Sequence, residues 1–375
     1  MTERESCIVF LFVSTWVVYV LVGYPLLLAL RARRPRPVRA EPCELNVTVL
    51  LPVHNGERWI DAKLRSLLAL DYPRHLMRIL VLSDGSAERT EEIAAEFASQ
   101  GVEVLSLPHG GKAAALNTGM AQARSDILFF TDVRQPLEKS SLRLLVACFA
   151  DPEVDVASGE LVILAGEHRE QASVGLYWEY QKWIRKPLSR IDSVLGATGA
   201  IYAMRRMLAK PIDPATLLDD VLLPLQVFFA GYRVVFVESA LASDYQPSLE
   251  MEFRRKVRTQ AGIYHLLRFY PGLLGPGNGM WMDFVSHKLG RLTLPFALLA
   301  LVADSFFLPR PWAGIAVGGQ SAWLCLASVD RWVAERSPLK RLSSPARAFT
   351  VLMAAALCAV SIFFVPAKVL WRPTR

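Results

Sequence analysis

Hydrophobic residues form long uncharged runs near both ends of the chain and short runs between them. Residues 8–30 contain no charged side chain, and about 20 apolar residues in a helix are enough to cross the hydrocarbon core of a bilayer. Near the C-terminus, residues 311–329 and 348–367 are also uncharged, and residues 292–308 carry only Asp304. We therefore predict four transmembrane helices, one before and three after a long middle section.

The middle section has a different pattern, in which short apolar runs alternate with stretches of helical periodicity. The apolar runs are rich in Val, Ile, Leu and Phe, and they read NVTVLLPV, RILVLSD, VEVLSLP and DILFFTD. Amphipathic helices are predicted between them, near residues 57–70, 87–99 and 111–123. Nearly continuous apolar strands separated by helices are typical of a parallel sheet covered on both faces, so we predict an α/β domain.

Positive charge indicates the side of the membrane on which the middle section is expected. Arginines are concentrated in residues 31–39, and Lys and Arg are concentrated again in residues 331–347. Because loops rich in Lys and Arg stay in the cytoplasm, an external N-terminus and a cytoplasmic middle section satisfy both clusters, although Lys368, Arg372 and Arg375 would then lie outside. A cleaved signal peptide fits less well, since its apolar stretch is shorter and ends in small residues.

Overall composition supports a membrane protein of a reducing compartment. Hydrophobic residues make up 53% of the chain, mean hydropathy is +0.28 and the net charge is +7. Much of the excess positive charge lies beside predicted membrane helices, so anionic lipid headgroups, rather than nucleic acid, are the expected partner. The five Cys residues show neither metal-ligand spacing nor a disulfide pattern.

Polar residues at the ends of the predicted strands indicate one ligand pocket. In such a sheet the ligand lies beyond the carboxyl ends of the strands, where Pro52, Asn55, Asp84, Lys112 and Asp132 are expected. The stretch SDGS is also explained by a simple turn that caps a helix. HGGKAAALN is a Gly-rich turn entering a helix and suits phosphate binding, but it lacks the spacing of a Walker A loop.

Seven motifs, taken in order, resemble those of family 2 glycosyltransferases: LPVHN, LSDGS, GGKAAALN, FFTDVRQ, GATGAIYA, LLDDVLLPLQV and EFRRKVRTQAG. The resemblance covers residues 45–265 and is greatest to the membrane-bound branch that includes cellulose, hyaluronan and poly-N-acetylglucosamine synthases. It implies a GT-A fold, the Rossmann-like fold of nucleotide-diphospho-sugar transferases, with N-terminal and C-terminal transmembrane helices. Together with the uncharged runs, the resemblance predicts a transmembrane anchor with a basic linker (1–40), a cytoplasmic catalytic domain (44–265), an interfacial segment (266–290) and about three transmembrane helices (291–375).

The resemblance also implies roles in binding the nucleotide sugar and the acceptor. Asp84 would hold the base of a nucleoside diphosphate, with a bias toward uridine, in a pocket shaped by Pro52 and Asn55. Lys112 would lie near the diphosphate, and Asp132 would face the ribose or a metal ion. The acceptor would meet a close-approach loop made of Gly196, Ala197, Thr198, Gly199 and Ala200.

Transfer of a sugar to a hydroxyl group needs a carboxylate that removes a proton and positive charge that stabilises the departing diphosphate. The resemblance assigns the base to Asp220 and a diphosphate contact to Arg258. Asp219 and Asp220 open a predicted helix that runs to about Phe229, and the positive end of this helix favours ionised Asp220. The structural alternative is that the two Asp residues only cap the helix.

Two positions depart from the family pattern. The metal motif normally has two acidic residues, whereas here Asp132 is followed by Val133 and Arg134. Either Asp132 binds a divalent cation, Mg²⁺ or Mn²⁺, together with diphosphate oxygens, which we favour, or Arg134 neutralises the phosphates itself. Processive synthases carry Gln-x-x-Arg-Trp in the later helix, whereas here Thr259 follows Arg258, so transfer of one or a few sugars is expected.

The leading hypothesis is an inverting hexosyltransferase of the inner (plasma) membrane, which moves a sugar from a nucleotide sugar to a saccharide or lipid-linked acceptor at the cytoplasmic face. Exopolysaccharide or cell-envelope glycan synthesis, with polysaccharide-export partners, would be its setting. Polyprenyl phosphate is an alternative acceptor, but it is already ionised and needs no strong base, so the pair Asp219 and Asp220 argues against it. A non-catalytic nucleotide-binding membrane scaffold is a third hypothesis, motivated by Arg134 and opposed by the retained acidic motifs.

Overall fold

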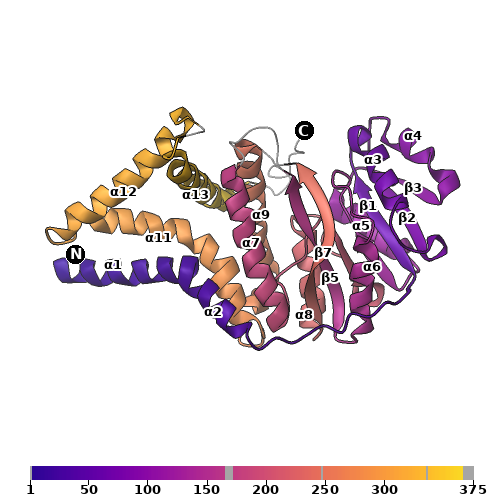
Figure 1. The fold of residues 1–375 in the computed structure, drawn as a ribbon, viewed down its shortest axis with the longest axis horizontal. Helices are drawn as coiled ribbons and strands as arrows, with labels where there is room; N and C mark the ends of the chain where they lie inside the picture. Colours follow the sequence, from indigo (N-terminus) through magenta and orange to yellow (C-terminus); the bar gives the residue numbers. More distant parts are fainter. Residues whose placement is uncertain (1, 165–171, 246–247, 335–336, 366–375) are drawn as a thin grey trace. The chain divides into compact units, whose positions relative to one another are not determined.

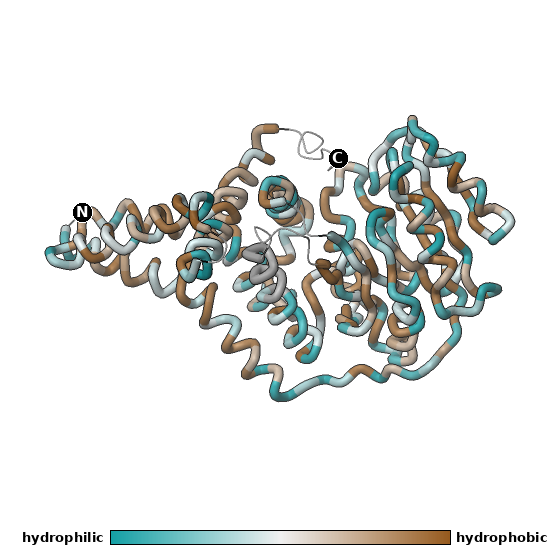
Figure 2. The backbone as a smooth tube through the Cα atoms, turned by 45° about the horizontal axis from the view of Figure 1, so that its top comes forward, coloured by the Kyte–Doolittle hydropathy of each residue, from teal (hydrophilic) through white to brown (hydrophobic). Residues whose placement is uncertain are grey.

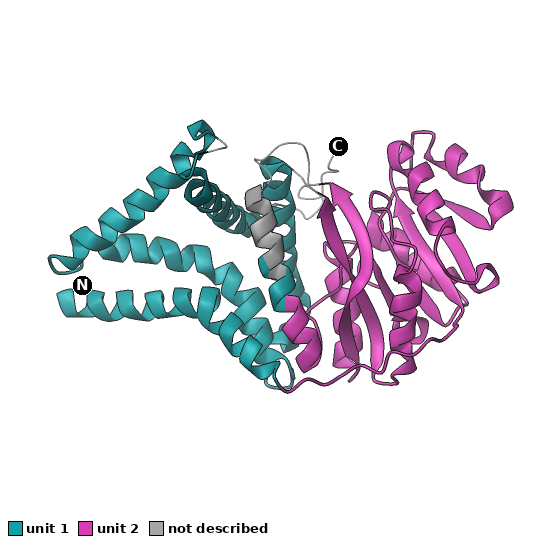
Figure 3. Cartoon of the chain, viewed as in Figure 1, with its two compact units in different colours: residues 1–33, 165–184, 247–375 teal, residues 34–164, 185–246 magenta. Residues whose placement is uncertain are grey.

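The computed structural model describes residues 2–164, 172–245, 248–334 and 337–365 (Figure 1). The chain divides into two compact units, coloured separately in Figure 3. Residues 34–164 and 185–246 form one, which we call the α/β unit. Residues 1–33, 165–184 and 247–375 belong to the other, which we call the helical unit.

The α/β unit is built on a seven-stranded sheet with the order β3-β2-β1-β4-β6-β5-β7. Its strands are β1 (Val47–Val53), β2 (Met77–Asp84), β3 (Val102–Leu107), β4 (Ile127–Phe130), β5 (Val154–Leu164), β6 (Tyr202–Arg205) and β7 (Arg233–Tyr245). The first four are parallel, as predicted, and every residue of β4 is buried. The strand β6 was not predicted from the sequence, and it pairs antiparallel with β4 and β5.

Helices of the α/β unit bury apolar side chains in its core. They are α3 (Glu57–Leu68), α4 (Thr90–Ala95), α5 (Lys112–Gln122), α6 (Ser141–Ala147) and α8 (Asp219–Phe229). Ile60, Leu64 and Leu67 recur on α3 at helical spacing and are fully buried. On α5, a Cβ at Gly119 would lie 2.7 Å from a methyl group of Leu82, so glycine lets this helix approach the sheet closely.

The helical unit contains four helical stretches that are long and apolar enough to cross a membrane. Figure 2 colours the backbone by the hydropathy of each residue. They are Glu3–Arg31, Trp281–Ser305, Trp312–Trp332 and Lys340–Phe363, and they contain α1 (Glu3–Val18), α2 (Tyr24–Arg31), α10 (Trp281–Asp283), α11 (Gly290–Ser305), α12 (Trp312–Val329) and α13 (Lys340–Cys358). The four predicted spans are therefore present as candidates, and the second begins at Trp281 rather than at residue 292. This unit also contains α9 (Leu249–Phe269), whereas α7 (Ala172–Ile191) has residues in both units.

Buried polar contacts join the first apolar helix to the second within the helical unit. Ser6 Oγ donates a hydrogen bond to Asp304 Oδ1 at 2.8 Å, and both side chains are buried. Arg31 and the Tyr24 hydroxyl both donate to Asp283, whose carboxylate is also buried. Because a buried carboxylate is costly without such donors, these contacts fix the pairing of the two helices.

Candidate active site

Lys112 joins two carboxylates from distant parts of the sequence. It is the first residue of α5, and its Nζ lies 2.9 Å from Asp132 Oδ1 and 3.1 Å from Asp219 Oδ2. Asp132 follows the end of β4, and Asp219 opens α8. Although burial opposes the charge on Lys112, the carboxylates of Asp132, Asp219 and Asp220 together raise its pKa well above the usual value. The ammonium group is therefore charged.

The predicted acceptor loop packs directly on the first turn of α8. Ala197 N donates to the carbonyl oxygen of Asp220 at 2.7 Å. Gly196 has φ +129, and a Cβ at Gly199 would lie 3.0 Å from Asp220 Oδ2. Glycine is required at the first position by backbone conformation and at the second by the approach of the carboxylate. The loop therefore leaves Asp220 accessible where a side chain at residue 199 would crowd it.

Arg185 is a site residue that the sequence did not reveal. It lies on α7 and donates to Thr198 Oγ1 at 2.7 Å and to the carbonyl oxygen of Gly196 at 3.3 Å. Burial lowers its pKa, while the carboxylates of Asp220 and Glu160 act in the opposite direction. Its position one residue after the buried Ile184 was a weak signal within YQKWIRK, a stretch to which sequence alone gave no role.

Tyr202 is a second residue that the sequence did not single out. Its ring is fully buried and stacks on Phe130, with the ring centroids 4.4 Å apart. Its hydroxyl group has no hydrogen-bond partner among the described residues. Burial raises the tyrosine pKa far above its usual value, and the carboxylates of Asp219, Asp220 and Asp132 raise it further. The phenol thus stays protonated beside the acidic cluster as an unused donor.

Asp84 binds the Gly-rich turn that leads into α5. Its Oδ1 accepts hydrogen bonds from Gly110 N at 2.7 Å and from Gly111 N at 3.1 Å. Gly111, with φ +89, has a backbone conformation that other residues rarely adopt, and it directly precedes Lys112. Two residues predicted to bind opposite ends of the nucleotide, Asp84 and Lys112, are thus connected through a single turn.

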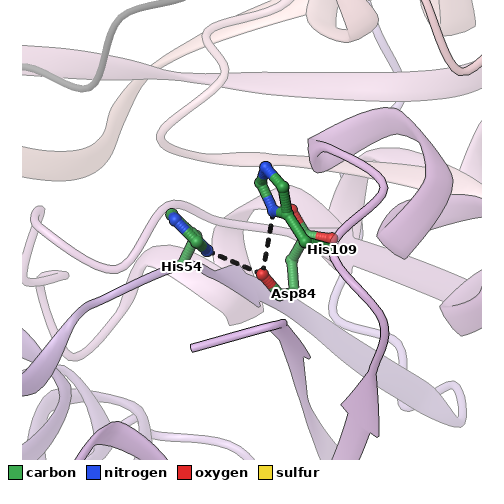
Figure 4. A group of neighbouring side chains, drawn as sticks. All are labelled: His54, Asp84 and His109. Atoms are coloured by element: carbon green, nitrogen blue, oxygen red, sulfur yellow. Dashed lines mark hydrogen bonds and ion pairs between the residues drawn. The ribbon is translucent and has the colours of Figure 1, made fainter. Parts of the chain in front are cut away.

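Two histidines flank Asp84 (Figure 4). His54 Nδ1 lies 2.7 Å from the carbonyl oxygen of Asp84, and His109 Nδ1 lies 3.0 Å from its Oδ2. The two imidazole rings lie with their centroids 4.4 Å apart and their planes tilted by 32°. The three side chains offer ligand atoms within 4.8 Å of one another, which is close enough for a metal ion. However, the ring nitrogens nearest Asp84 are hydrogen-bonded to it, so an ion would have to displace these bonds.

The remaining predicted nucleotide-site residues fall in two places. Asn55 adopts φ 52, and its Oδ1 accepts from Ala87 N at 2.9 Å, which ties the loop after β1 to the SDGS turn. Pro52, within β1, is half-buried. Arg258 lies on α9 of the helical unit, so its predicted contact with the diphosphate stays a prediction.

Arg134 occupies the second position of the metal motif and is bound to another carboxylate. Its Nη2 pairs with Asp244 Oδ2 at the end of β7, and the Asp244 side chain is buried. Gln135 Nε2 donates to the same oxygen at 2.9 Å. Part of the charge that was predicted to neutralise phosphates is therefore engaged by Asp244, and the phosphate role of Arg134 stays a prediction.

Residues 48–212 match the family model described as Glycosyl transferase family 2. The chain therefore contains a family 2 glycosyltransferase domain. The chain is 26% identical over 240 residues to the probable glycosyltransferase YdaM of Bacillus subtilis. The aligned region covers 60% of this chain and 56% of that protein. It is also 29% identical over 344 residues to the beta-monoglucosyldiacylglycerol synthase of Synechocystis sp.. This aligned region covers 81% of this chain and 69% of that protein.

Among solved structures, the glycosyltransferase chain is similar to the mannosyltransferase PcManGT from Pyrobaculum calidifontis, determined with GDP-Man and Mn²⁺. The TM-score is 0.72 at 20% identity, over 95% of this chain and 99% of that one. This likeness confirms the predicted GT-A fold. The chain spans about half, 56%, of the length of the Bacillus subtilis protein.

Proposed function

We propose that this protein transfers a sugar from a nucleotide-diphosphate sugar to a hydroxyl group of a lipid-linked or saccharide acceptor, with inversion at the sugar. The observation that carries the proposal is the convergence of Asp132 and Asp219 on Lys112, with Asp220 beside them under the acceptor loop. Such a site offers a base for the acceptor and charge for the diphosphate, which are the two requirements of the reaction.

The donor would lie along the carboxyl ends of β1, β2 and β4. Its base would lie at Asp84, where His54 and His109 offer flat aromatic faces for stacking. Its diphosphate would lie at the start of α5, where Lys112 and the backbone N–H groups of the helix terminus attract anions. Uridine is the base we expect.

A divalent cation fits this arrangement. Asp132 and Asp219 contact the same ammonium group, so Asp219 supplies a second carboxylate that Arg134 cannot. The charge of the three carboxylates Asp132, Asp219 and Asp220 exceeds that of Lys112 and Arg185 together. Mg²⁺ or Mn²⁺ would take oxygen ligands from Asp132 and the diphosphate. When bound, the cation would neutralise charge on the departing diphosphate. The mannosyltransferase from Pyrobaculum calidifontis was determined with Mn²⁺, which supports this part of the proposal.

Asp220 would act as the base. It lies in the first turn of α8, at the positive end of the helix dipole, and its charge interacts with that of Arg185. It would take the proton of the acceptor hydroxyl as that oxygen attacks the anomeric carbon and the bond to the diphosphate breaks. A single displacement of this kind inverts the anomeric centre.

The candidate membrane helices support the proposed acceptor and location. Four helical stretches are apolar enough to span a bilayer, and a relative aligned over 81% of the chain is named for synthesis of a glycosylated diacylglycerol. We favour a lipid-linked acceptor at the cytoplasmic face of the plasma membrane, used in cell-envelope or exopolysaccharide glycan synthesis together with export partners. The basic segments beside the spans would contact anionic lipid headgroups.

The test uses membranes containing the full-length protein, a panel of nucleotide sugars, and Mg²⁺ or Mn²⁺, with release of nucleoside diphosphate as the readout. Asp220→Asn should abolish transfer while nucleotide binding persists, and Glu88→Gln, at an exposed position of the same unit, should be fully active. Full activity of the Asp220 variant would remove the base assignment. Nucleotide binding without turnover by the unaltered protein, with either metal, would favour the scaffold hypothesis instead.

A further inference from the structure

Lys63 is a lysine inside the hydrophobic core of the α/β unit. It lies on α3 with an exposed fraction of 1%, on the face that also carries Ile60, Leu64 and Leu67. Burial lowers its pKa to about 7, while the charge of Asp132 acts in the opposite direction. An amino group in such surroundings is costly unless it is hydrogen-bonded. Methionine would fill a similar volume without this cost, so the effect of the lysine lies in the bonds it makes.

Those bonds hold both ends of the turn that carries Asp132. Lys63 Nζ donates to Thr131 Oγ1 at 2.6 Å and to the carbonyl oxygen of Gln135 at 2.5 Å. The two acceptors lie on either side of residues 132–134, so one amino group closes the turn from beneath. Both the ammonium and the neutral amine have at least two N–H groups, and the geometry does not depend on the charge of Lys63.

Thr131 extends the connection to the acceptor loop. Its hydroxyl donates to the carbonyl oxygen of Ala200 at 2.7 Å, and Ala200 ends the loop that packs on Asp220. A hydroxyl group has a single hydrogen, so donation to Ala200 leaves Thr131 to accept the bond from Lys63. The order Lys63 to Thr131 to Ala200 is thereby fixed. It links the Asp132 turn and the acceptor loop through buried groups only.

We propose that Lys63 is a positioning residue for sugar transfer, which sets the Asp132 turn and the acceptor loop at a fixed spacing through Thr131. It touches neither substrate and takes no part in proton transfer. The inference rests on the proposed function, because it assumes that Asp132 faces the donor. Groups that hold a ligand-binding side chain in place typically change affinity or activity by about 10–100-fold when removed.

The experiment compares full-length Lys63→Met, Thr131→Val and the double variant with two controls. Thr131→Ser keeps the hydroxyl group, and Leu64→Ala removes core volume from the next residue of the same helix. We expect Lys63→Met and Thr131→Val each to lower kcat and to raise the Mn²⁺ concentration needed for half-maximal activity. For each variant the two effects combined should amount to about 10–100-fold. The double variant should be no worse than the more severe single one, since both break the same connection. Thr131→Ser should retain activity.

Each other outcome contradicts the inference. The inference is overturned if Lys63→Met leaves kcat and the Mn²⁺ requirement unchanged. It is also overturned if Leu64→Ala, at the same thermal stability as Lys63→Met, changes kcat and the Mn²⁺ requirement by the same amounts. Additive effects in the double variant would show that Lys63 does not act through Thr131. If Lys63→Met fails to fold, Thr131→Val against Thr131→Ser decides. If the unaltered protein transfers no sugar, the proposed function fails, and calorimetric binding of UDP with Mn²⁺ to the same variants still tests the positioning role.

Discussion

Lys112 contacts Asp219 across the α/β unit, with 3.1 Å between Nζ and Oδ2, although the two residues begin different helices far apart in the sequence. The same nitrogen holds Asp132 at 2.9 Å. In this chain the second carboxylate near Asp132 therefore comes from the start of α8 rather than from residue 134. Lys112 therefore balances negative charge from both carboxylates, and under the proposed function it would also contact the diphosphate of the donor.

Replacement of Lys112 by Met should lower kcat for transfer by about 100–1,000-fold, the usual effect of removing one group that stabilises transition-state charge. Lys112→Arg should recover part of the activity because it keeps the positive charge. Steady-state kinetics with the full-length protein in membranes measures both. Lys139→Met, at an exposed position of the same unit, is the matched control. Equal activity of the Lys112→Met and control variants would exclude the charge role.

Gly199→Ala should reduce kcat without unfolding the protein. Its Cβ would lie 3.0 Å from Asp220 Oδ2, so the carboxylate would have to move by a few tenths of an ångström from its position. Gly277→Ala serves as the control, since a Cβ there meets no atom within 4 Å. Comparison of kcat, KM and thermal stability separates the two effects. A loss confined to stability would show that Gly199 is needed for packing alone.

Lys63 should make stability depend on pH. Its pKa is lowered to about 7 in the folded protein, from the usual 10.5, mainly by burial. Below pH 7 the folded state carries the full cost of the buried charge, and between about pH 7 and 10 the unfolded state binds more protons, so the free energy of unfolding rises with pH. The free energy of unfolding in urea should be measured across this pH range for the metal-free protein and for Lys63→Met. The value for the unaltered protein should rise with pH relative to that of Lys63→Met. A pH-independent difference would contradict the lowered pKa.

Arg134→Gln should lower the free energy of unfolding by about 1–3 kcal/mol, because Asp244 then stays buried without its strongest donor. Transfer should remain dependent on Mg²⁺ or Mn²⁺, since Asp132 and Asp219 are unchanged. Asp244→Asn in the same protein should reduce the penalty by removing the unpaired charge. Thermal unfolding and metal titration of activity are the measurements. Loss of metal activation in Arg134→Gln, with stability intact, would instead assign Arg134 to the phosphates.

Local pattern was sufficient for much of the fold. The first four strands and the helices between them were predicted within a few residues, because β-strand and helix periods are local properties. The helix that opens at Asp219 ends at Phe229, as its sequence indicated. The direction of β6 was not predictable, since it depends on which edge of β4 is free when the chain returns.

Contacts between distant segments explain what sequence could not provide. Asp219 was predicted to be catalytic together with Asp220, but its ion pair with Lys112 depends on α5 and α8 reaching the same edge of the sheet. Lys63 gave a usable signal, because it lies three residues after Ile60 and four before Leu67, on the buried face of α3. Tyr202 gave none, since an aromatic residue in a short strand is usually core packing, and its free hydroxyl group becomes evident only in three dimensions.

The carboxylate of Asp84 accepts hydrogen bonds from the backbone N–H groups of Gly110 and Gly111, immediately before Lys112. A nucleobase bound by this carboxylate would compete with these two hydrogen bonds. Weakening them would loosen the turn and so change the position of Lys112, one residue later. Under the proposed function, binding of the base and binding of the phosphates would thus be thermodynamically linked. Binding of a nucleoside should therefore change the affinity for a free diphosphate, and binding of the diphosphate should change the affinity for the nucleoside by the same factor.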